Sequence, residues 1–315
     1  MVKIGWTWLH GHWTNPLHGE APQADPNLRH LKGHLMKLKK IVLTGAAGRL
    51  GSYLREPLSQ MCETLVSTDI SDDIGKLYAN EAYVQADLAS YDAIFPILED
   101  AEMVVHFGAI VDEKPFEELL GPNFVGSYNI WEAGYQQGVR RIVYASSIHA
   151  VGMHKKADFI GIDAPHRPDT FYGLAKCFTE DLGSMYWDKR GLESVHLRIL
   201  SAAQVNNARA LGSWLSYDDL IHLVTRAVDT PSVGFSIVYG VSNNDRAPVD
   251  NTKAAFLGYR PKDNAEQFAE KVLAETAAPD LTDPAEMLQG GPFAKVDLGQ
   301  SGIAQMKIVN DKKTV

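Results

Sequence analysis

A tyrosine and a lysine four residues apart, Tyr172 and Lys176 in the stretch FYGLAK, could carry out acid–base chemistry. On a helix, residues at this spacing lie on one face, so the phenol and the ammonium group would be neighbours. A half-buried tyrosine beside a solvated lysine would have the same spacing without any catalytic role. Because a nearby positive charge favours the phenolate, we expect Lys176 to lower the pKa of Tyr172 and make it a proton acceptor.

Ser147 is the third candidate catalytic residue and ends the apolar run RRIVYASS. A hydroxyl there can hydrogen-bond a substrate oxygen while Tyr172 takes up the substrate proton. Ser147, Tyr172 and Lys176 suffice for hydride transfer at a carbinol carbon, since a nicotinamide cofactor performs the difficult step. Each residue alone has an ordinary structural explanation, so their joint placement in a nucleotide-binding fold decides the interpretation.

The elements that would position these residues begin with a nucleotide-binding pattern. A short strand-like run, KKIVLTG, leads into Gly45, Gly48 and Gly51, and RLGSYLREPLSQ then continues as a helix. Such glycines permit a tight turn and a close approach of the pyrophosphate, which faces the helix N-terminus. A second strand, TLVSTD, ends at Asp69, where a carboxylate would bind the adenosine ribose and repel a 2′-phosphate. The alternative is an aspartate that caps a turn. The pattern predicts NAD rather than NADP.

Further apolar runs alternate with helical periodicity, which predicts an α/β protein with a Rossmann-like, doubly wound parallel sheet. The predicted strands are AYVQADL, EMVVHFGAI, RRIVYASS and ESVHLRIL, and Gly138 is expected to end the helix NFVGSYNIWEAGYQQG. In this fold, ligands bind at the carboxyl ends of the strands. The residues at such ends include Asp87, Phe107, Gly108, Ala109, Ser146 and Ser147.

Composition limits the class of protein. The chain has 315 residues, of which 45% are hydrophobic, enough for one large domain or one domain with a small lobe. A net charge of −9 argues against a nucleic-acid partner, which needs a basic face. Cys62 and Cys177 provide neither a metal-binding spacing nor a disulfide framework, and no apolar run is long enough to span a membrane. We expect a cytoplasmic protein without a metal, a nucleic-acid partner or a membrane attachment.

Three segments are expected along the chain. Residues 1–35 have no sustained period, and the sequence from Met36 reads like a natural start, so we expect a disordered or non-native extension before it. The spacing of five histidines in this extension matches no metal-ligand template: His10, His12, His18, His30 and His34. Residues 36–200 are expected to form the NAD-binding core with the catalytic residues. Residues 201–315 are expected to form a substrate-binding lobe and a C-terminal segment.

From about Lys39 onward, the chain resembles the extended short-chain dehydrogenase/reductases. The resemblance is carried by TGAAGRLG, ADL, HFGA, NFVG, ASSIHAVG and YGLAK. Within that superfamily it looks most like the bacterial NAD-dependent uronate dehydrogenases, through EKPFEELL, APHRPDTFYGLAKCFTEDLGSMYWDK, SWLSYDDL, FLGYRPKDNAEQF and QGGPF. Those enzymes oxidise the anomeric carbon of galacturonate or glucuronate to an aldarolactone and produce NADH. The resemblance therefore implies an acidic sugar as substrate, and we also expect a homo-oligomer.

The resemblance also implies roles for individual residues. It makes Tyr172 the proton acceptor, with Ser147 and Lys176 as its partners. It places cofactor contacts at Arg49, Leu50, Asp69, Asp87, Leu88, Gly108 and Ala109. It places substrate contacts at Ser147, His149, Ser201 and Arg209. The arginine would bind the anionic end of the sugar, because a guanidinium group pairs with carboxylate, sulfonate or phosphate oxygens in a fork.

Two positions depart from the pattern of the uronate dehydrogenases. Members of that family have a serine shortly after the fourth strand and an asparagine directly after the catalytic serine, and both reach sugar hydroxyls. This chain has Val111 and Ile148 at those positions. The reaction type is unaffected, but the identity of the sugar stays open between a hexuronate and another anionic sugar, such as a sulfonated or phosphorylated aldose.

Two functions of other kinds were weighed against this interpretation. A nucleotide-sugar epimerase or dehydratase would use the same fold. However, related dehydratases carry an Asp–Glu pair beside the catalytic serine or threonine, and SSIHAVG has none. The region after the sixth strand is also short for a nucleotide-diphosphate pocket. A non-catalytic NAD-binding scaffold would be expected to lack Tyr172 or Lys176, and both are present.

Overall fold

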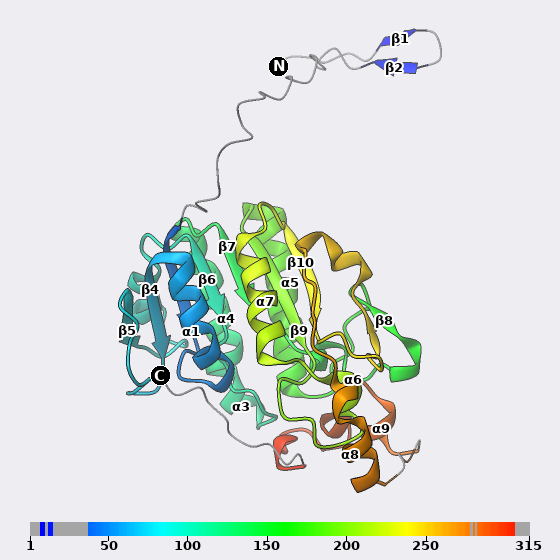
Figure 1. Cartoon of the computed structure of the whole chain (residues 1–315). Helices are drawn as coiled ribbons and strands as arrows, with labels where there is room; N and C mark the ends of the chain where they lie inside the picture. Colours follow the sequence, from blue (N-terminus) through cyan, green and yellow to red (C-terminus); the bar gives the residue numbers. More distant parts are fainter. Residues whose placement is uncertain (1–6, 10–11, 15–36, 278–279, 281, 306–315) are drawn as a thin grey trace. The chain divides into compact units, whose positions relative to one another are not determined.

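A computed structural model describes residues 7–9, 12–14, 37–277, 280 and 282–305 (Figure 1). The chain divides into two units, Met1–Met36 and Lys37–Val315. In the first unit, β1 (Thr7–Leu9) and β2 (His12–Thr14) pair as antiparallel strands, which the composition of that segment did not predict. The rest of the predicted extension, including His10, His18, His30 and His34, lies outside the described residues.

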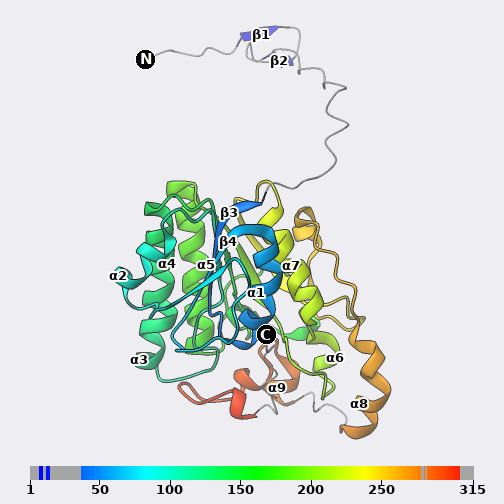
Figure 2. The same ribbon diagram turned by 60° about the vertical axis from the view of Figure 1, so that its left-hand side comes forward.

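A seven-stranded parallel sheet forms the centre of the second unit (Figures 1 and 2). Its order is β10-β9-β7-β6-β3-β4-β5, and every neighbouring pair is parallel. The strands are β3 (Leu38–Thr44), β4 (Cys62–Asp69), β5 (Glu81–Gln85), β6 (Met103–His106), β7 (Arg141–Tyr144), β9 (Glu193–Ile199) and β10 (Phe235–Gly240). The strand order reverses between β3 and β6, and such switch points bind ligands in this fold. The predicted Rossmann-like fold is confirmed.

Helices cover both faces of the sheet (Figure 2). One face is covered by α1 (Arg49–Met61) and α7 (Tyr217–Asp229), and the other by α2 (Tyr91–Ile94), α4 (Gly126–Gln136) and α5 (Phe171–Arg190). Along β3, Ile41 and Leu43 belong to the first core, whereas Val42 belongs to the second. Because both faces are covered, β6 and β7 are buried along their whole length.

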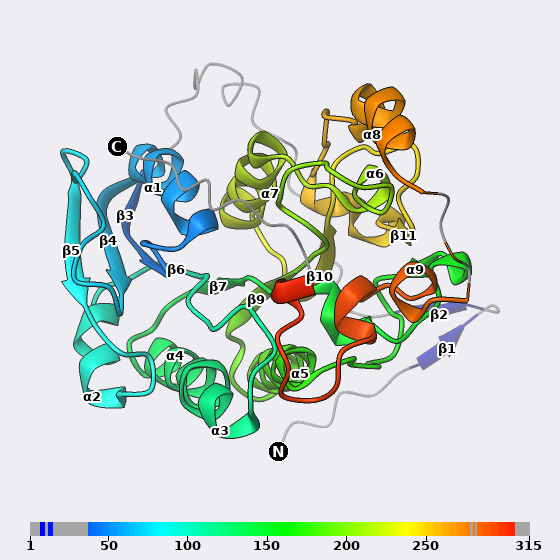
Figure 3. The same cartoon turned by 90° about the horizontal axis from the view of Figure 1, so that it is seen from below.

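Smaller elements surround the carboxyl ends of the strands (Figure 3). They include α3 (Phe116–Leu119) with the π-helical turn Leu120–Val125, α6 (Ala210–Ser213), α8 (Ala269–Glu275) and α9 (Pro284–Met287). A separate two-stranded sheet pairs β8 (Ile160–Gly161) with β11 (Val249–Asp250). Single 3-10 helices, some of them away from these ends, are Pro96–Leu98, Ile148–Val151, Lys156–Asp158, Thr252–Leu257, Ala265–Phe268, Gly291–Ala294 and Ile303–Gln305.

The boundary expected at residue 200 does not coincide with a division between sheet and lobe. The strand β10 and the helix α7 follow residue 200 but belong to the sheet and its covering layer. Conversely, β8 precedes residue 200 and pairs with β11 outside the main sheet. Sequence periodicity marks elements but does not reveal which distant element each one pairs with.

Two further properties hold for the described part of the chain. None of its helices is long and apolar enough to cross a membrane. The same residues contain no group of three or more His, Cys, Asp or Glu side chains that could hold a metal ion. Cys62 and Cys177 are both buried free thiols.

Candidate active site

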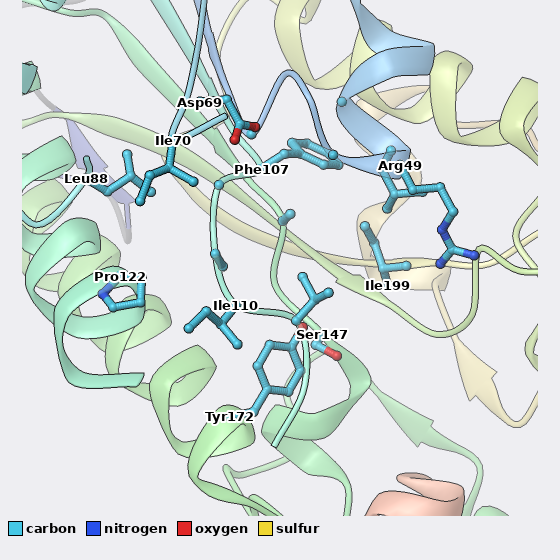
Figure 4. Close-up of a pocket in the computed structure, with 18 of the residues that line it drawn as sticks. Arg49, Asp69, Ile70, Leu88, Phe107, Ile110, Pro122, Ser147, Tyr172 and Ile199 are labelled. Carbon is cyan, nitrogen blue, oxygen red and sulfur yellow. The ribbon is translucent and has the colours of Figure 1, made fainter. Parts of the chain in front are cut away.

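The carboxyl ends of the central strands open into a cleft of about 710 Å³ (Figure 4). Its walls include every residue that the sequence assigned to the cofactor, namely Gly45, Gly48, Arg49, Leu50, Gly51, Asp69, Asp87, Leu88, Phe107, Gly108, Ala109, Tyr172 and Lys176. Ser147 lines the same cleft. The nucleotide loop and the three candidate catalytic residues therefore share one cavity, although they come from distant parts of the sequence.

The glycine-rich loop after β3 can form only because its glycines lack side chains. Gly45 has a φ of +72°, and a Cβ there would lie 2.6 Å from the backbone of Phe107 and Gly108. A Cβ at Gly51 would lie 2.0 Å from the carbonyl oxygen of Gly45. No side chain caps α1 at Gly48, and the N-terminus of a helix favours phosphate oxygens. The loop therefore fits a dinucleotide pyrophosphate.

Asp69 both closes a turn and lines the cleft. Its Oδ2 accepts a hydrogen bond of 2.9 Å from the backbone N–H of Ala47, and its Oδ1 accepts one of 3.1 Å from Ser71. Each carboxylate oxygen has two lone pairs, so the group keeps capacity for ribose hydroxyls. Ile70 and Leu88 lie nearby in the cleft and provide an apolar wall for a flat base (Figure 4).

Helix α5 carries the tyrosine and the lysine in its first two turns. The Thr170 side chain caps this helix by accepting a hydrogen bond of 3.0 Å from the N–H of Gly173. The Lys176 ammonium donates to the carbonyl oxygen of Ala145, at 2.8 Å, and lies 5.2 Å from the centre of the Tyr172 ring. Ser147 stands beside Tyr172 (Figure 4). The helix cap and the end of β7 thus hold the three groups in one place.

The pKa values of Tyr172 and Lys176 differ from what the sequence led us to expect. Burial raises the pKa of Tyr172 to about 12, a shift that the Ser147 hydroxyl opposes and the charges of Asp169 and Asp112 reinforce. Burial also lowers the pKa of Lys176 to about 7, against the attraction of Glu180. The expected lowering of the tyrosine pKa by Lys176 is therefore wrong for the protein alone, because burial disfavours the charged form of both groups.

A buried ionic cluster lies one turn further along α5. The Glu180 carboxylate accepts hydrogen bonds from Arg198 at 2.8 Å, from His166 at 2.7 Å and from the hydroxyl of Ser146. Burial acts to raise the pKa of Glu180, but His166 and Arg198 overcome it and hold that pKa at about 2. The cluster fixes the residue before Ser147 and keeps a negative charge near Lys176.

Four of the six residues expected to bind the substrate line the cleft: Ser147, Val111, His149 and Ser201. The Val111 side chain is 58% exposed, so the cleft presents a methyl surface where the resemblance implied a hydroxyl. Ile148 does not line the cleft. It is fully buried in an apolar cluster with Val151 and Leu200, because the 3-10 turn after Ser147 directs it inward.

Arg209 also does not line the cleft in this structure. Its Nη2 donates a hydrogen bond of 2.8 Å to the carbonyl oxygen of Gln289, and its side chain packs against Gly291. Its Nε is buried and has no hydrogen-bond partner among the described residues. Burial lowers the pKa of Arg209, and the charges of Asp169 and Glu286 oppose that shift. The guanidinium therefore braces the Gln289–Gly291 turn, which leads to Phe293 in the wall of the cleft.

Sequence reasoning assigned no role to two apolar residues that line the cleft, Phe293 and Ile303. Phe293 lies in the stretch QGGPF, and its ring centre is 4.2 Å from that of His149. Ile303 is held by its backbone N–H, which donates to Asp112 at 3.0 Å. The only sequence signal for this wall was the presence of QGGPF among the stretches shared with a known family.

Glu113 connects this C-terminal wall to the catalytic helix. It is fully buried, and its Oε2 accepts a hydrogen bond of 2.9 Å from the backbone N–H of Tyr172. Its Oε1 accepts one of 2.8 Å from the N–H of Gly299. The start of α5 and the C-terminal segment are thus tied to one carboxylate.

Comparison with known proteins agrees with this geometry. The sequence model of the NAD dependent epimerase/dehydratase family matches residues 41–203. A uronate dehydrogenase from Pseudomonas putida is 44% identical over 256 residues, which are 81% of this chain and 95% of that protein. The crystal structure of a glucuronic acid dehydrogenase from Chromohalobacter salexigens superposes with a TM-score of 0.79 at 38% identity, over 82% of this chain and 98% of that one.

A mutant of the uronate dehydrogenase from Agrobacterium tumefaciens, solved in complex with NAD, is also similar. Its TM-score is 0.78 at 41% identity, and the match covers 82% of this chain and 98% of that one. The match to the family model spans the glycine loop and the candidate catalytic residues. The chain belongs to the NAD dependent epimerase/dehydratase family and is similar to its uronate dehydrogenases.

Proposed function

We propose that this protein is an NAD-dependent dehydrogenase that oxidises the anomeric hydroxyl of a hexuronate to an aldarolactone. The observation that carries this proposal is the single cleft in which Ser147, Tyr172 and Lys176 meet the glycine-rich loop. The similarity to uronate dehydrogenases over four-fifths of the chain supports the choice of substrate. Asp69 and Ser201 line the same cleft of about 710 Å³, so one cavity can accept a dinucleotide and a sugar together.

Ser147, Tyr172 and Lys176 have different roles in this proposed reaction. When bound, NAD would accept the hydride, and its positively charged nicotinamide ring would favour the phenolate form of Tyr172. Ser147 hydrogen-bonds the C1 oxygen and orients it toward Tyr172. Tyr172, as the phenolate, removes the hydroxyl proton while the C1–H bond gives up its hydride, and the C1–O bond becomes the lactone carbonyl. Lys176, which donates a hydrogen bond to Ala145 O, would stabilise the phenolate and would hydrogen-bond the ribose of a bound cofactor.

Recognition of the sugar relies on polar groups from two segments, together with an apolar wall. Ser147, His149 and Ser201 offer hydrogen bonds, whereas Val111 and Phe293 offer apolar contact to the C–H faces of the ring. We propose that Arg209 supplies the positive charge behind this wall that favours an anionic sugar over a neutral one. Its charge lies at the same end of the cleft as His149, since both interact with Asp169.

The test is a screen for NAD reduction by the full-length protein with galacturonate, glucuronate, sugar phosphates, sulfonated sugars and neutral aldoses. We expect NADH formation to be fastest with a hexuronate and to be much slower with NADP. A fast reaction with a neutral aldose and none with any hexuronate would overturn the substrate assignment. Bound NAD without turnover of any sugar would favour a non-catalytic role, and interconversion of nucleotide sugars would favour an epimerase.

We further propose that the protein is a cytoplasmic homo-oligomer. The helices α4 and α5 expose several large apolar side chains, Tyr128, Tyr135, Leu174, Phe178 and Met185. Apolar patches of this kind mark association surfaces. The buried free thiols agree with a reducing compartment. Light scattering at several concentrations would measure the oligomeric state, and cell fractionation would measure the location.

A further inference from the structure

A buried carboxylate at the sugar end of the cleft has no role in the reaction described above. Asp169 directly precedes the Thr170 cap of α5, and its side chain is 0% exposed. Its Oδ2 lies 2.8 Å from Nδ1 of His149, and its Oδ1 accepts a hydrogen bond of 2.9 Å from the Thr170 hydroxyl. The carboxylate therefore connects the cap of the catalytic helix to a histidine that lines the cleft.

Two backbone segments close over this carboxylate. A Cβ at Gly152 would lie 2.1 Å from Asp169 Oδ2, and a Cβ at Gly290 would lie 1.8 Å from it. The two segments are joined by a hydrogen bond of 2.9 Å from Gly290 N to Gly152 O. A hydrogen bond enclosed in this way is stronger than one in water, and an unpaired carboxylate there would be costly. The site is thus shaped to hold Asp169 against His149.

The histidine ring has little freedom to turn. It packs against Phe293, with ring centres 4.2 Å apart, and against Tyr172, with ring centres 5.6 Å apart. Its side chain is 11% exposed, and it lines the cleft. Among the residues that the structure describes, no group hydrogen-bonds its other ring nitrogen, Nε2. That nitrogen is therefore free to meet a ligand.

The partner of Nδ1 determines what Nε2 can bind. An ionised carboxylate only accepts hydrogen bonds, so Nδ1 must carry the proton that joins it to Asp169. In the neutral imidazole, Nε2 then has a lone pair and can only accept. A sugar hydroxyl can donate to such a group, whereas a carboxylate cannot.

Building on the function proposed above, we propose that Asp169 is a positioning residue that holds His149 as the Nδ1–H tautomer, so that Nε2 accepts a hydrogen bond from a ring hydroxyl of the sugar. His149 thereby selects a hydroxyl at its position on the sugar, and the acidic group binds elsewhere in the cleft. Arg209 lies outside the cleft wall, and its charge interacts with that of Asp169.

The first test reads the tautomer and needs no substrate. Histidine-ring nitrogen NMR spectra of the full-length protein, at a pH of about 9 where an ordinary imidazole is neutral, distinguish Nδ1–H from Nε2–H. The His149 signals are assigned by their loss in His149→Gln. We expect Nδ1–H in the wild type and Nε2–H in Asp169→Asn, because the amide can donate to Nδ1. The matched control is Asp112→Asn, which removes a carboxylate that contacts Ser301 and Ile303 in the C-terminal wall and should leave the tautomer unchanged.

The second test is a double-mutant cycle with the sugar that the protein oxidises best. Asp169→Asn should raise the KM for the sugar about tenfold, the equivalent of one lost hydrogen bond, with a smaller change in kcat. His149→Asn keeps an amide near the Nδ1 position but cannot reach into the cleft. Adding Asp169→Asn to it should change the KM little further, since the carboxylate acts through the imidazole. The dissociation constant for NAD should be unchanged in all three variants.

Several outcomes would overturn this assignment. One is an Nε2–H tautomer in the wild type, and another is an Asp169→Asn variant with unaltered tautomer and KM. A third is that Asp169→Asn raises the KM for the sugar equally with and without His149. The last outcome would mean that Asp169 only supports the packing. If Asp169→Asn fails to fold, the wild-type spectrum still decides. Failure of every hexuronate in the NAD screen would refute the proposed function but would leave the tautomer result valid.

Discussion

The two ends of the cleft are assembled in different ways. At the nucleotide end, the walls come from loops that directly follow β3, β4, β5 and β6. At the sugar end, the walls combine the turn after β7, the start of α5, the segment after β9 and the C-terminal segment around Phe293. The nucleotide end is therefore built from similar loops at successive strand ends, whereas the sugar end depends on contacts between segments that are distant in the sequence.

This difference explains which of the expected residues line the cleft and which do not. All residues expected at the nucleotide end line the cleft, because in this fold the glycine loop and the carboxyl ends of the strands lie at the ligand-binding edge of the sheet. At the sugar end, Ile148 turns into the core and Arg209 lies behind the Gln289–Gly291 turn. Neighbouring residues of this 3-10 turn point in different directions, so Ser147 and His149 line the cleft while Ile148 between them packs in the core.

The largest expected effect lies where the two ends meet. Tyr172→Phe should lower kcat by about 10²–10⁴-fold, because the ring still packs but the titrating hydroxyl is lost. Steady-state rates of NADH formation measure the change, and NAD binding followed by protein fluorescence should be unaltered. A variant within a few-fold of the wild type would remove Tyr172 from the proton transfer.

A change at the sugar end should depend on the charge of the substrate. Arg209→Ala should lower kcat/KM for a hexuronate by about 10- to 200-fold, since an interaction with a charged group is worth about 1.5–3 kcal/mol. A neutral aldose of the same ring configuration should lose much less. Equal losses for the two sugars would show that Arg209 acts only by bracing the turn at Gln289.

A change at the nucleotide end should depend on the cofactor instead. Asp69→Ala should raise the KM for NAD about tenfold and reduce the preference for NAD over NADP, because one group that binds ribose and repels a 2′-phosphate is lost. The substitution should also lower the melting temperature, since the Asp69 carboxylate accepts hydrogen bonds from the N–H groups of Ala47 and Ser71. Unchanged cofactor preference would assign ribose recognition to another residue.

The smallest expected effect concerns stability and its dependence on pH. The pKa of Lys176 is about 7 in the folded protein but about 10.4 in an unfolded chain, so the unfolded state binds more protons between these values. The stability contributed by this site therefore rises with pH across that window. Lys176→Met should melt several degrees above the wild type at pH ~7, and the difference should shrink toward pH ~10.

Melting curves at a series of pH values test this prediction. Lys189→Met, on the last turn of the same helix and exposed, is the matched control and should show no such trend. A difference between Lys176→Met and the wild type that stays constant with pH would mean that Lys176 is charged in the folded protein throughout.

The sequence by itself determined the fold class and the nucleotide end of the site. Apolar strand runs, the spacing of Gly45, Gly48 and Gly51 and the aspartate at the end of the second strand are local features, and local steric and hydrogen-bonding rules are enough to interpret them. The catalytic set was also accessible, because Ser147 ends a strand and Tyr172 and Lys176 share a helix face.

Only the tertiary structure decided the rest. It placed β10 in the sheet, brought Phe293 over His149, enclosed Asp169 beneath Gly152 and Gly290, and tied Glu113 to the start of α5. It also reversed the expected pKa shift of Tyr172, since burial outweighs the nearby lysine. Burial and long-range contacts depend on the positions of all the segments at once, and no local pattern in the sequence records them.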